Sequence, residues 1–467
     1  MSDDLARTLA AQRTAFAAAG APPLEARRAD LRAIERLLKR HATELAEAVR
    51  SDFGNRSLHE TRLMEIFPSV EAARYARSRV ASWMKGERKS VAPYFIPARA
   101  RIVRQPLGVV GIIVPWNYPI GLTFEPLVAA LAAGNRVMIK CSELTPRTGE
   151  TLARLLRATF SPDRVSVHNG GVELGRAFAA LSFDHLLFTG STDVGRSVMR
   201  AAADTLTPVT LELGGKSPAI VGADAELDMA AARIISGKCK NAGQTCIAPD
   251  YVLVPVGTTA KFIDAARTTV AARYPSLLAN PDYTSIISDR HFDRLNALLD
   301  DAREHGAAVT PLHPSVHAAD RPSRTIPPTI VTGVTDEMQL MREEIFGPIL
   351  PVIAYRTLAE AIAFVNARPR PLALYYFGQN PTDVERVLTQ THSGGVTIND
   401  VMLHYAQAAL PFGGIGPSGM GAYHGRDGFE TFSARKAVFE QAARTGSGLL
   451  EPPYGARFNA IVRALIR

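Results

Sequence analysis

The sequence predicts an open α/β fold built from two successive units. Three observations support this: the first 50 residues have the spacing of amphipathic helices, short apolar runs then alternate with helical patterns, and a second series of the same kind follows Glu212. Strands that alternate with helices in this way join by right-handed crossovers into parallel sheets. At roughly 150 residues per domain, a chain of 467 residues suggests two or three domains.

The first unit begins with helices, because apolar side chains recur every three or four residues between Leu24 and Leu45. A helical pattern over 122–133 ends at Gly134, and a later helix opens with Thr145 and Pro146, a favourable N-cap and first-turn pair. Short apolar runs predict strands at 108–114, 136–140, 164–168, 184–189 and 209–213.

The second unit repeats this alternation. Helical patterns lie at about 226–242, 258–272 and 289–305. Strands are predicted at 218–221, 250–255, 328–331 and 349–353. An apolar run at 393–399 and a glycine-rich stretch at 411–425 then precede an amphipathic tail.

Composition and charge exclude several classes of protein. The net charge of +8 comes from one stretch, 74–104, which holds nine basic residues and one acid. The rest of the chain is therefore nearly neutral, and no nucleic-acid partner is expected. The three cysteines are too few for a disulfide framework and indicate a reducing, cytoplasmic location. The uncharged run 105–124 is broken by Pro and Gly, which favours a buried strand and loop over a transmembrane segment.

Two phosphate-loop patterns differ in their context. Gly414, Gly416 and Gly419 form G-x-G-x-x-G, but Pro411 precedes them and more glycines follow, so no helix can start there. FTGSTDVG, residues 188–195, instead follows a strand and opens a helix whose first amide groups could bind an anion. A plain capped turn is the alternative for this second motif. No metal site is expected, because neither CxxC nor HExxH occurs.

Three polar residues could carry chemistry. Cys246 lies in a predicted loop, where a thiol is more accessible, but an unperturbed thiol is only about 3% ionised at pH 7, so catalysis would need a positive neighbour or a base. Glu212 ends a strand beside glycines, where ligands sit in open α/β sheets, although an ordinary surface acid would fit equally. Asn117 could polarise a carbonyl oxygen or serve as a turn residue. Cys239 is expected to be buried, and Cys141 could be either.

Taken together, these motifs resemble the aldehyde dehydrogenase superfamily, in its order and spacing over most of the chain. GQTCIAPDY and GMGAYHG resemble the class 3 branch, and NDVMLHYAQAALPFGG with the later PPYG is most similar to the bacterial coniferyl aldehyde dehydrogenase group. The motifs are PWNYP (115–119), KCSE (140–143), FTGSTDVG (188–195), ELGGKSP (212–218), GQTC (243–246), EEIFGP (343–348) and PFGGIGPSGMG (411–421).

The resemblance implies an NAD(P)-dependent oxidation of an aldehyde to its acid. Cys246 would be the nucleophile that forms a thiohemiacetal and then a thioester. Asn117 and the Cys246 amide would hold the oxyanion, and Glu212 would be the general base that activates water for hydrolysis.

The resemblance also implies the cofactor residues. Lys140 and Glu143 would bind the adenine ribose. The pyrophosphate would lie at Trp116 and at the helix that follows Gly190 and Ser191, with Gly195 in its first turn. Glu344 and Phe346 would flank the nicotinamide ribose. Glu143 favours NAD, because a carboxylate repels the 2′-phosphate of NADP, although NADP stays possible. Cys141 replaces a proline that is usual in the family.

The expected substrate pocket is mixed apolar and aromatic. This suits an aromatic or medium-chain aliphatic aldehyde, and a phenylpropenal such as coniferyl aldehyde is the hypothesis from the subgroup. The residues expected to line it are Tyr118, Leu122, Thr245, Ile247, His404 and Phe412.

The resemblance finally implies a domain plan and a homodimer. A Rossmann-type cofactor domain would span 1–211 and a catalytic domain 212–393. A β arm from about 88–103 and 394–435 would extend the sheet of a neighbouring subunit, and 436–467 would form a tail.

Three alternatives remain open at this stage. A CoA-acylating dehydrogenase would share the cysteine, but a hydrolytic base such as Glu212 would be superfluous in it. A non-catalytic NAD-binding protein would not need Cys246, Glu212 and Asn117 together. A nucleic-acid or membrane-surface protein would depend on the basic stretch 74–104.

Overall fold

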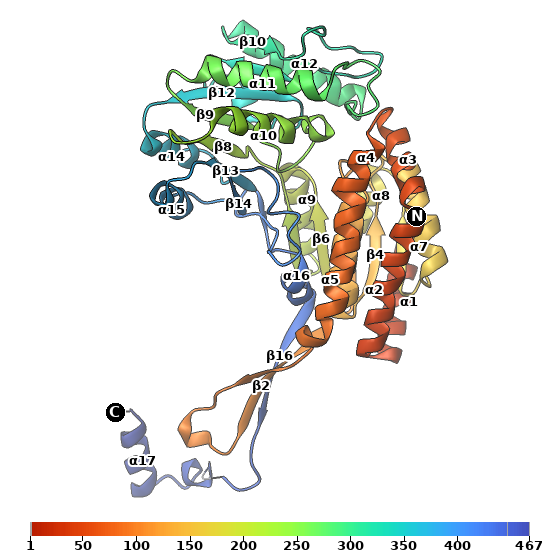
Figure 1. Ribbon diagram of the computed structural model, residues 1–467. Helices are drawn as coiled ribbons and strands as arrows, with labels where there is room; N and C mark the ends of the chain where they lie inside the picture. The colour runs from red at the N-terminus through yellow and green to blue at the C-terminus, as the bar shows by residue number, and fades with distance from the viewer. Residues whose placement is uncertain (1, 446, 467) are drawn as a thin grey trace.

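The computed structural model describes residues 2–445 and 447–466, and Figure 1 shows two α/β bodies with a projecting arm. The first body holds a six-stranded sheet in the order β15-β7-β6-β3-β4-β5. All neighbouring strands in it are parallel except β15, which runs antiparallel to β7. Its strands are β3 (Val109–Ile113), β4 (Arg136–Lys140), β5 (Val165–His168), β6 (His185–Thr189), β7 (Val209–Glu212) and β15 (Gly419–Met420).

The second body holds a seven-stranded sheet in the order β10-β11-β12-β9-β8-β13-β14. Only the edge pair β10 and β11 is antiparallel. Its strands are β8 (Pro218–Val221), β9 (Tyr251–Pro255), β10 (Ala308–Pro311), β11 (Thr329–Thr332), β12 (Ile349–Tyr355), β13 (Ala373–Phe377) and β14 (Gly395–Ile398). The predicted α/β fold class is therefore confirmed.

β13 was not predicted from the sequence, although it is buried and lies between β8 and β14. Its five residues, ALYYF, directly follow RPRPL, whose two prolines are typical of a loop. Tertiary burial, rather than a local pattern, explains why this short aromatic segment is a strand.

Helices cover both sheets, and the predicted ones form with small shifts at their ends. α6 is the centre of the first body, because all of its residues are buried and it packs against α2, α5 and α16. The helices of this body are α1 (Ser2–Ala19), α2 (Leu24–Arg40), α3 (Ala42–Phe53), α4 (Leu58–Thr61), the π-helical turn η1 (Arg62–Ile66), α5 (Phe67–Trp83), α6 (Gly121–Ala133), α7 (Pro146–Thr159), α8 (Val172–Ala179), α9 (Thr192–Ala203) and α16 (Gly425–Thr431).

The second body and the tail contain the remaining helices. They are α10 (Leu227–Cys239), the 3₁₀ turn η3 (Lys240–Gly243), α11 (Thr259–Arg273), α12 (Asp289–Glu304), α13 (Gln339–Arg342), α14 (Leu358–Asn366), α15 (Pro381–Gln390) and α17 (Ala456–Ile466), with the short 3₁₀ turn η4 (Ser447–Leu450). A further 3₁₀ turn, η2 (Pro93–Phe95), lies in the projecting arm. Within 2–445 and 447–466, no helix combines the length and the apolar character needed to cross a bilayer.

The arm is a three-stranded antiparallel sheet of β1 (Glu87–Lys89), β2 (Arg99–Pro106) and β16 (Ser433–Glu440). Figure 1 shows it projecting from the first body, with α17 beyond its tip. The expected second arm segment, 394–435, differs from this: β14 joins the seven-stranded sheet, β15 pairs with β7, and α16 packs on α5 and α6. Only β16 reaches the arm, because the glycine-rich stretch holds the preceding residues against the first body.

The glycine-rich stretch 411–425 serves close packing and opens no helix at its G-x-G-x-x-G, as its context predicted. Gly419 pairs with Glu212 at a φ of 146°, and a Cβ there would collide with the carbonyl oxygen of Leu211. Only glycine permits both this backbone conformation and this approach.

Many arginines of the basic stretch 74–104 are paired with acids of the same chain. Arg74 and Arg77 both contact Glu35, and the buried Arg104 lies 3.0 Å from Glu430. These ion pairs therefore join α2 to α5 and fix the base of the arm.

We predict that Asn135→Ala destabilises the fold by about 3 kcal/mol, because buried polar groups would lose their hydrogen bonds. The fully buried Asn135 side chain accepts from the Gly108 amide at 2.9 Å and donates to the Phe432 carbonyl at 2.8 Å, so it ties β3 to the segment entering β16. Urea unfolding would measure the change. Asn366→Ala, which removes one exposed hydrogen bond, is the control and should cost less than about 0.5 kcal/mol.

Candidate active site

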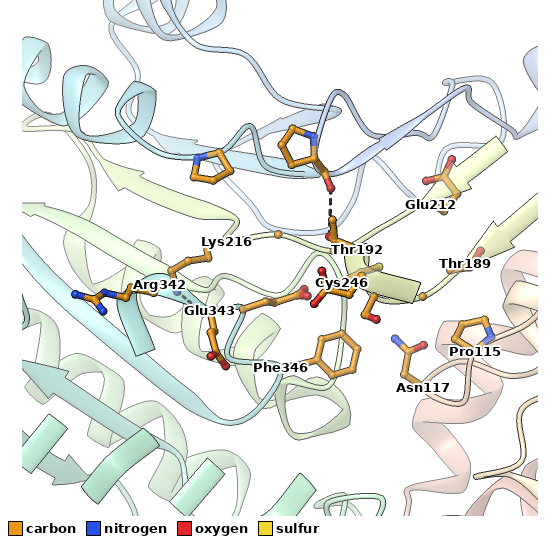
Figure 2. A pocket seen from close by; sticks show the side chains of 18 of the residues that line it. Pro115, Asn117, Thr189, Thr192, Glu212, Lys216, Cys246, Arg342, Glu343 and Phe346 are labelled. Atoms are coloured by element: carbon orange, nitrogen blue, oxygen red, sulfur yellow. Dashed lines mark hydrogen bonds between the residues drawn. The ribbon is translucent and has the colours of Figure 1, made fainter. Parts of the chain in front are cut away.

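A cavity of about 830 Å³ lies between the carboxyl ends of β3, β6 and β7 in the first body and the loops that precede β8, β9, β12 and β13 in the second body. Ligands bind at the carboxyl edge of open α/β sheets, and the volume suits a large organic ligand. Figure 2 shows Cys246 near the middle of the view, with Asn117 and Phe346 to one side and Glu212 to another. The polar and aromatic lining includes Trp116, Asn117, Gly190, Ser191, Glu212, Lys216, Cys246, His291, Arg294, Glu344 and Phe346.

Cys246 stands in a rigid loop between η3 and β9. Asn241 and Ala242 both have a φ of 50°, and Gly243 follows with a φ of 72°, so the chain turns sharply before the cysteine. The Gln244 side chain fixes the loop, because it donates to the Asn241 and Ser285 carbonyls and accepts from the Ile287 amide. The thiol is only partly buried and faces the cavity.

Asn117 follows β3 and is held from three directions. Its side-chain Nδ2 donates to the Gln244 carbonyl at 3.2 Å, and its backbone carbonyl oxygen accepts from Asn241 Nδ2 at 3.0 Å and from Arg56 Nη1 at 2.6 Å. The side-chain amide is therefore fixed beside the cysteine loop. A donor with a fixed position is what stabilisation of an oxyanion requires.

Arg56 connects the backbone of Asn117 to the N-terminal helices. Its guanidinium is fully buried and lies 3.1 Å from Glu65, between the rings of Phe53 and Tyr118. The other oxygen of Glu65 accepts the Ile120 amide at 2.7 Å. The ion pair therefore fixes the backbone from Asn117 to Gly121, through the Asn117 carbonyl and the Ile120 and Gly121 amides.

Glu212 ends β7 with its carboxylate buried at the cavity. Neither carboxylate oxygen has a hydrogen-bond partner among the described residues. Burial raises the pKa of the Glu212 carboxyl well above its ordinary value. Such a group is a stronger base once deprotonated, and raised pKa values of this kind are typical of catalytic sites.

Burial, followed by the charges of Glu344 and Glu212, also raises the pKa of the Cys246 thiol. The thiol is therefore the stable form at neutral pH, so a base or a developing positive charge has to favour the thiolate. Burial and the charge of Asp250 raise the pKa of Glu344 to about 8.

Five of the eight expected cofactor residues line the cavity: Trp116, Gly190, Ser191, Glu344 and Phe346. The other three lie outside its lining. Lys140 and Glu143 form an ion pair of 2.8 Å at the end of β4, and Gly195 packs on Leu213 inside the first turn of α9.

Two basic residues that were not predicted fix the loop of Glu344 and Phe346. Lys216 contacts Asp250 and donates to the Leu340 and Glu343 carbonyls, and Arg294 of α12 donates to the Glu344 carbonyl. Lys216 lies within the ELGGKSP motif, which could have identified it. Neither Arg294 nor Arg56 carries a local sequence signal.

The six expected substrate residues are buried and do not line the large cavity. Tyr118 and Thr245 share a hydrogen bond of 2.9 Å beside the cysteine loop, and Leu122 and Ile247 are packed in the core. His404 stacks on Phe412 in an aromatic cluster.

Cys239 and Cys141 are both buried, at the end of α10 and directly after β4. Cys239 therefore behaves as expected. Cys141 packs as a small apolar side chain, and burial raises its thiol pKa to about 12. No metal-binding group of three or more His, Cys, Asp or Glu occurs in the part of the chain that the structure describes.

The family profile described as "Aldehyde dehydrogenase family" matches residues 1–438. The chain belongs to the aldehyde dehydrogenase family. It is an oxidoreductase that oxidises aldehydes with a nicotinamide cofactor, as expected from the sequence.

Relatives of this aldehyde dehydrogenase extend over nearly its whole length. A probable coniferyl aldehyde dehydrogenase of Pseudomonas aeruginosa is 52% identical over 463 residues, which cover 99% of this chain and 96% of the relative. A coniferyl aldehyde dehydrogenase of a Pseudomonas species is 49% identical, with coverages of 93% and 90%. Aldehyde dehydrogenase family 3 member A2 of Rattus norvegicus is 42% identical, with coverages of 91% and 86%.

Solved structures confirm the fold. AldH of Staphylococcus aureus in a substrate-bound state superposes with a TM-score of 0.92 at 38% identity and covers 99% of both chains. A betaine aldehyde dehydrogenase of the same species, in complex with NAD+, gives a TM-score of 0.86 at 28% identity, with coverages of 97% and 90%.

We predict that Arg56→Met lowers kcat for aldehyde oxidation about 100-fold, because Asn117 would lose its strongest positional contact. Arg56→Lys, which keeps the charge, should lose less. The NAD dissociation constant should stay unchanged in both variants, since Arg56 does not line the cavity. Arg62→Lys, an exposed neighbour, is the control, and equal losses of kcat and NAD affinity would contradict a positioning role.

Proposed function

We propose that this chain converts an aldehyde to its carboxylic acid through a covalent adduct on Cys246. The observation that carries the proposal is that Cys246, Asn117 and Glu212 line one cavity between the two bodies. A thiol, an amide donor and a buried base are the three groups that acyl transfer to water requires.

In the first step, the Cys246 thiol loses its proton and its sulfur adds to the aldehyde carbon. Because burial raises the pKa of the Cys246 thiol, we expect its proton to leave through water to the solvent as the sulfur attacks, so Glu212 is still a carboxylate when the last step needs it. The new oxyanion accepts hydrogen bonds from Asn117 Nδ2 and from the Cys246 amide. Each such donor typically contributes roughly 3–4 kcal/mol to lowering the barrier.

In the last step, Glu212 accepts a proton from water as the water attacks the thioester. The carboxylate is buried and free of hydrogen bonds within the described residues, so it is available for this water. Cys246 leaves as the thiolate and the acid is released.

NAD fits the remaining part of the cavity, with NADP as the second candidate. When bound, it accepts the hydride from the aldehyde carbon. Gly190 admits no side chain, because a Cβ would meet the Phe188 ring, and the amide end of the twelve-residue helix α9 faces the cavity directly after it. Trp116 and Ser191 would hold the pyrophosphate, Glu344 and Phe346 the nicotinamide ribose, and Lys140 and Glu143 the adenine ribose. Glu143 favours NAD.

The proposed substrate is an aromatic aldehyde of the phenylpropenal type, such as coniferyl aldehyde. Support comes from the names of relatives about 50% identical to this chain and from the aromatic side chains near Cys246. Tyr118, Leu122, Thr245, Ile247, His404 and Phe412 would enclose it.

We predict that turnover without CoA is lost in Cys246→Ala, whereas Glu212→Gln still forms a burst of reduced cofactor but hydrolyses the thioester slowly. Turnover limited by hydrolysis should rise with pH up to a plateau above the range of an ordinary carboxylate, because only deprotonated Glu212 is a base and burial has raised its pKa. Absorbance at the reduced-nicotinamide band would follow both phases.

Glu344→Gln is the control for the pH profile, because the pKa of Glu344 is itself raised to about 8. If the rise of turnover with pH disappeared in Glu344→Gln, the titrating group would be Glu344, which would contradict the assignment of that rise to Glu212. Turnover that requires CoA would contradict hydrolysis and indicate a CoA-acylating enzyme.

We also propose a homodimer formed through the arm. Its tip exposes Tyr94, Ile96 and Phe439 by 65%, 66% and 50%, an apolar surface that suits a subunit interface. Light scattering at micromolar concentration should give twice the chain mass, and Ile96→Glu with Phe439→Glu should give the monomer. A monomeric wild-type protein would contradict the proposal.

A further inference from the structure

The backbone is strained shortly before Cys246. Asn241 and Ala242, neither of them glycine, both have a φ of 50°. A left-handed conformation costs free energy for any residue with a Cβ atom, and it persists only where the surrounding structure enforces it. The group that enforces this turn therefore also affects the position of the nucleophile that follows it.

Glu60 holds the peptide that enters the turn. Its Oε1 accepts the Asn241 amide at 2.7 Å, across 181 residues of sequence. Hydrogen bonds to an ionised acceptor are among the stronger ones in proteins. The carbonyl of Asn241 is fixed separately, because the backbone and side-chain N–H groups of Gln244 both donate to it. Asn241 is therefore held on one side by α4 of the first body and on the other by the cysteine loop itself.

Glu60 is itself fixed in position. The Ser57 side chain caps α4 by accepting the Glu60 amide at 3.3 Å. Burial raises the pKa of Glu60, and the charge of Arg56 and the hydrogen bond from Asn241 act against that rise. The carboxylate therefore lies near the same guanidinium that binds the Asn117 carbonyl.

The turn determines how the reactive groups of Cys246 are directed. Gly243, which follows the two strained residues, packs so closely that a Cβ would collide with the Gly347 carbonyl oxygen. Burial and two nearby carboxylates raise the pKa of the thiol, and hydrogen bonds from the Cys246 and Ile247 amides oppose that rise. If the turn relaxed at Asn241, these amides and the sulfur would move together with the loop.

We propose that Glu60 is a positioning residue for the reaction at Cys246. By holding the Asn241 amide, it keeps the left-handed turn that directs the Cys246 thiol and amide toward the aldehyde carbon. Glu60 acts on the cysteine and not on the cofactor, because it lies outside the lining of the large cavity. This inference rests on the proposed function, which gives the Cys246 sulfur its nucleophilic role.

Three substitutions separate the length of the Glu60 side chain from its charge. Glu60→Gln keeps an acceptor oxygen at the same distance and removes the charge, whereas Glu60→Asp keeps the charge on a side chain one carbon shorter. Glu60→Ala removes both. Glu60→Gln should keep kcat within about threefold of the wild-type value, whereas Glu60→Asp and Glu60→Ala should each lower it about 30-fold. The NAD dissociation constant should not change, and Glu47→Ala, which removes an exposed acid of α3, is the control.

Alkylation of Cys246 by iodoacetamide tests the same positioning without aldehyde or cofactor. The sulfur displaces iodide from the reagent, and the mass of the Cys246 peptide reports the rate. Glu60→Asp and Glu60→Ala should slow this reaction on the order of tenfold, and Glu60→Gln should leave it near the wild-type rate. Loss of a nearby negative charge would instead favour the thiolate, so faster alkylation in both Glu60→Gln and Glu60→Ala would overturn the positioning role.

A loss of kcat in Glu60→Gln beside wild-type kcat in Glu60→Asp would also overturn the proposal, because charge rather than side-chain length would then be decisive. Thermal unfolding and NAD binding identify any misfolded variant, and the comparison of Glu60→Gln with Glu60→Asp does not depend on Glu60→Ala. Slower alkylation in Glu60→Asp would support the positioning role even if no aldehyde were oxidised, so that result would refute the proposed function alone. Unchanged turnover and alkylation in both Glu60→Asp and Glu60→Ala would overturn the positioning role.

Discussion

The buried contact between Arg56 and Asn117 is the constraint on which the site depends. It joins helices at the start of the chain to the residues that follow β3, and Asn241 then joins those residues to the cysteine loop. A charge enclosed in this way tolerates little displacement, since each lost contact exposes an unpaired ion to a low-dielectric interior. The same contact that packs the N-terminal helices against the segment after β3 therefore sets the position of Asn117, the proposed oxyanion donor.

The fold could be predicted wherever local pattern and tertiary burial agree. The helix around Leu31 and Ile34 and the strands ending at Ile113 and Glu212 have clear sequence patterns, and they form where expected. β13 could not be predicted, because its burial depends on neighbours from distant parts of the sequence. The arm boundary failed for a related reason: a glycine-rich segment gives no local sign of which sheet edge it will approach.

The site residues also divide into those with a local sequence signal and those that depend on contacts between distant segments. Glu212 and Asn117 stand at the carboxyl ends of β7 and β3, where a topological rule places ligands, whereas Cys246 precedes β9 and was predicted from its loop. Arg56 and Arg294 lie on or beside helices whose sequences carry no functional pattern. Their importance arises from contacts between segments many residues apart, and only three-dimensional geometry can reveal such contacts.

The pairing of Gly419 with Glu212 also affects the order of folding. β15 joins the first sheet only after more than 400 residues have been synthesised, although the strand it covers ends at Glu212. Contacts between such distant segments form late, and the N-terminal part of a chain folds first during synthesis. The carboxylate at the end of β7 therefore remains hydrated in a nascent chain, and it acquires its basic character only when the C-terminal strand docks.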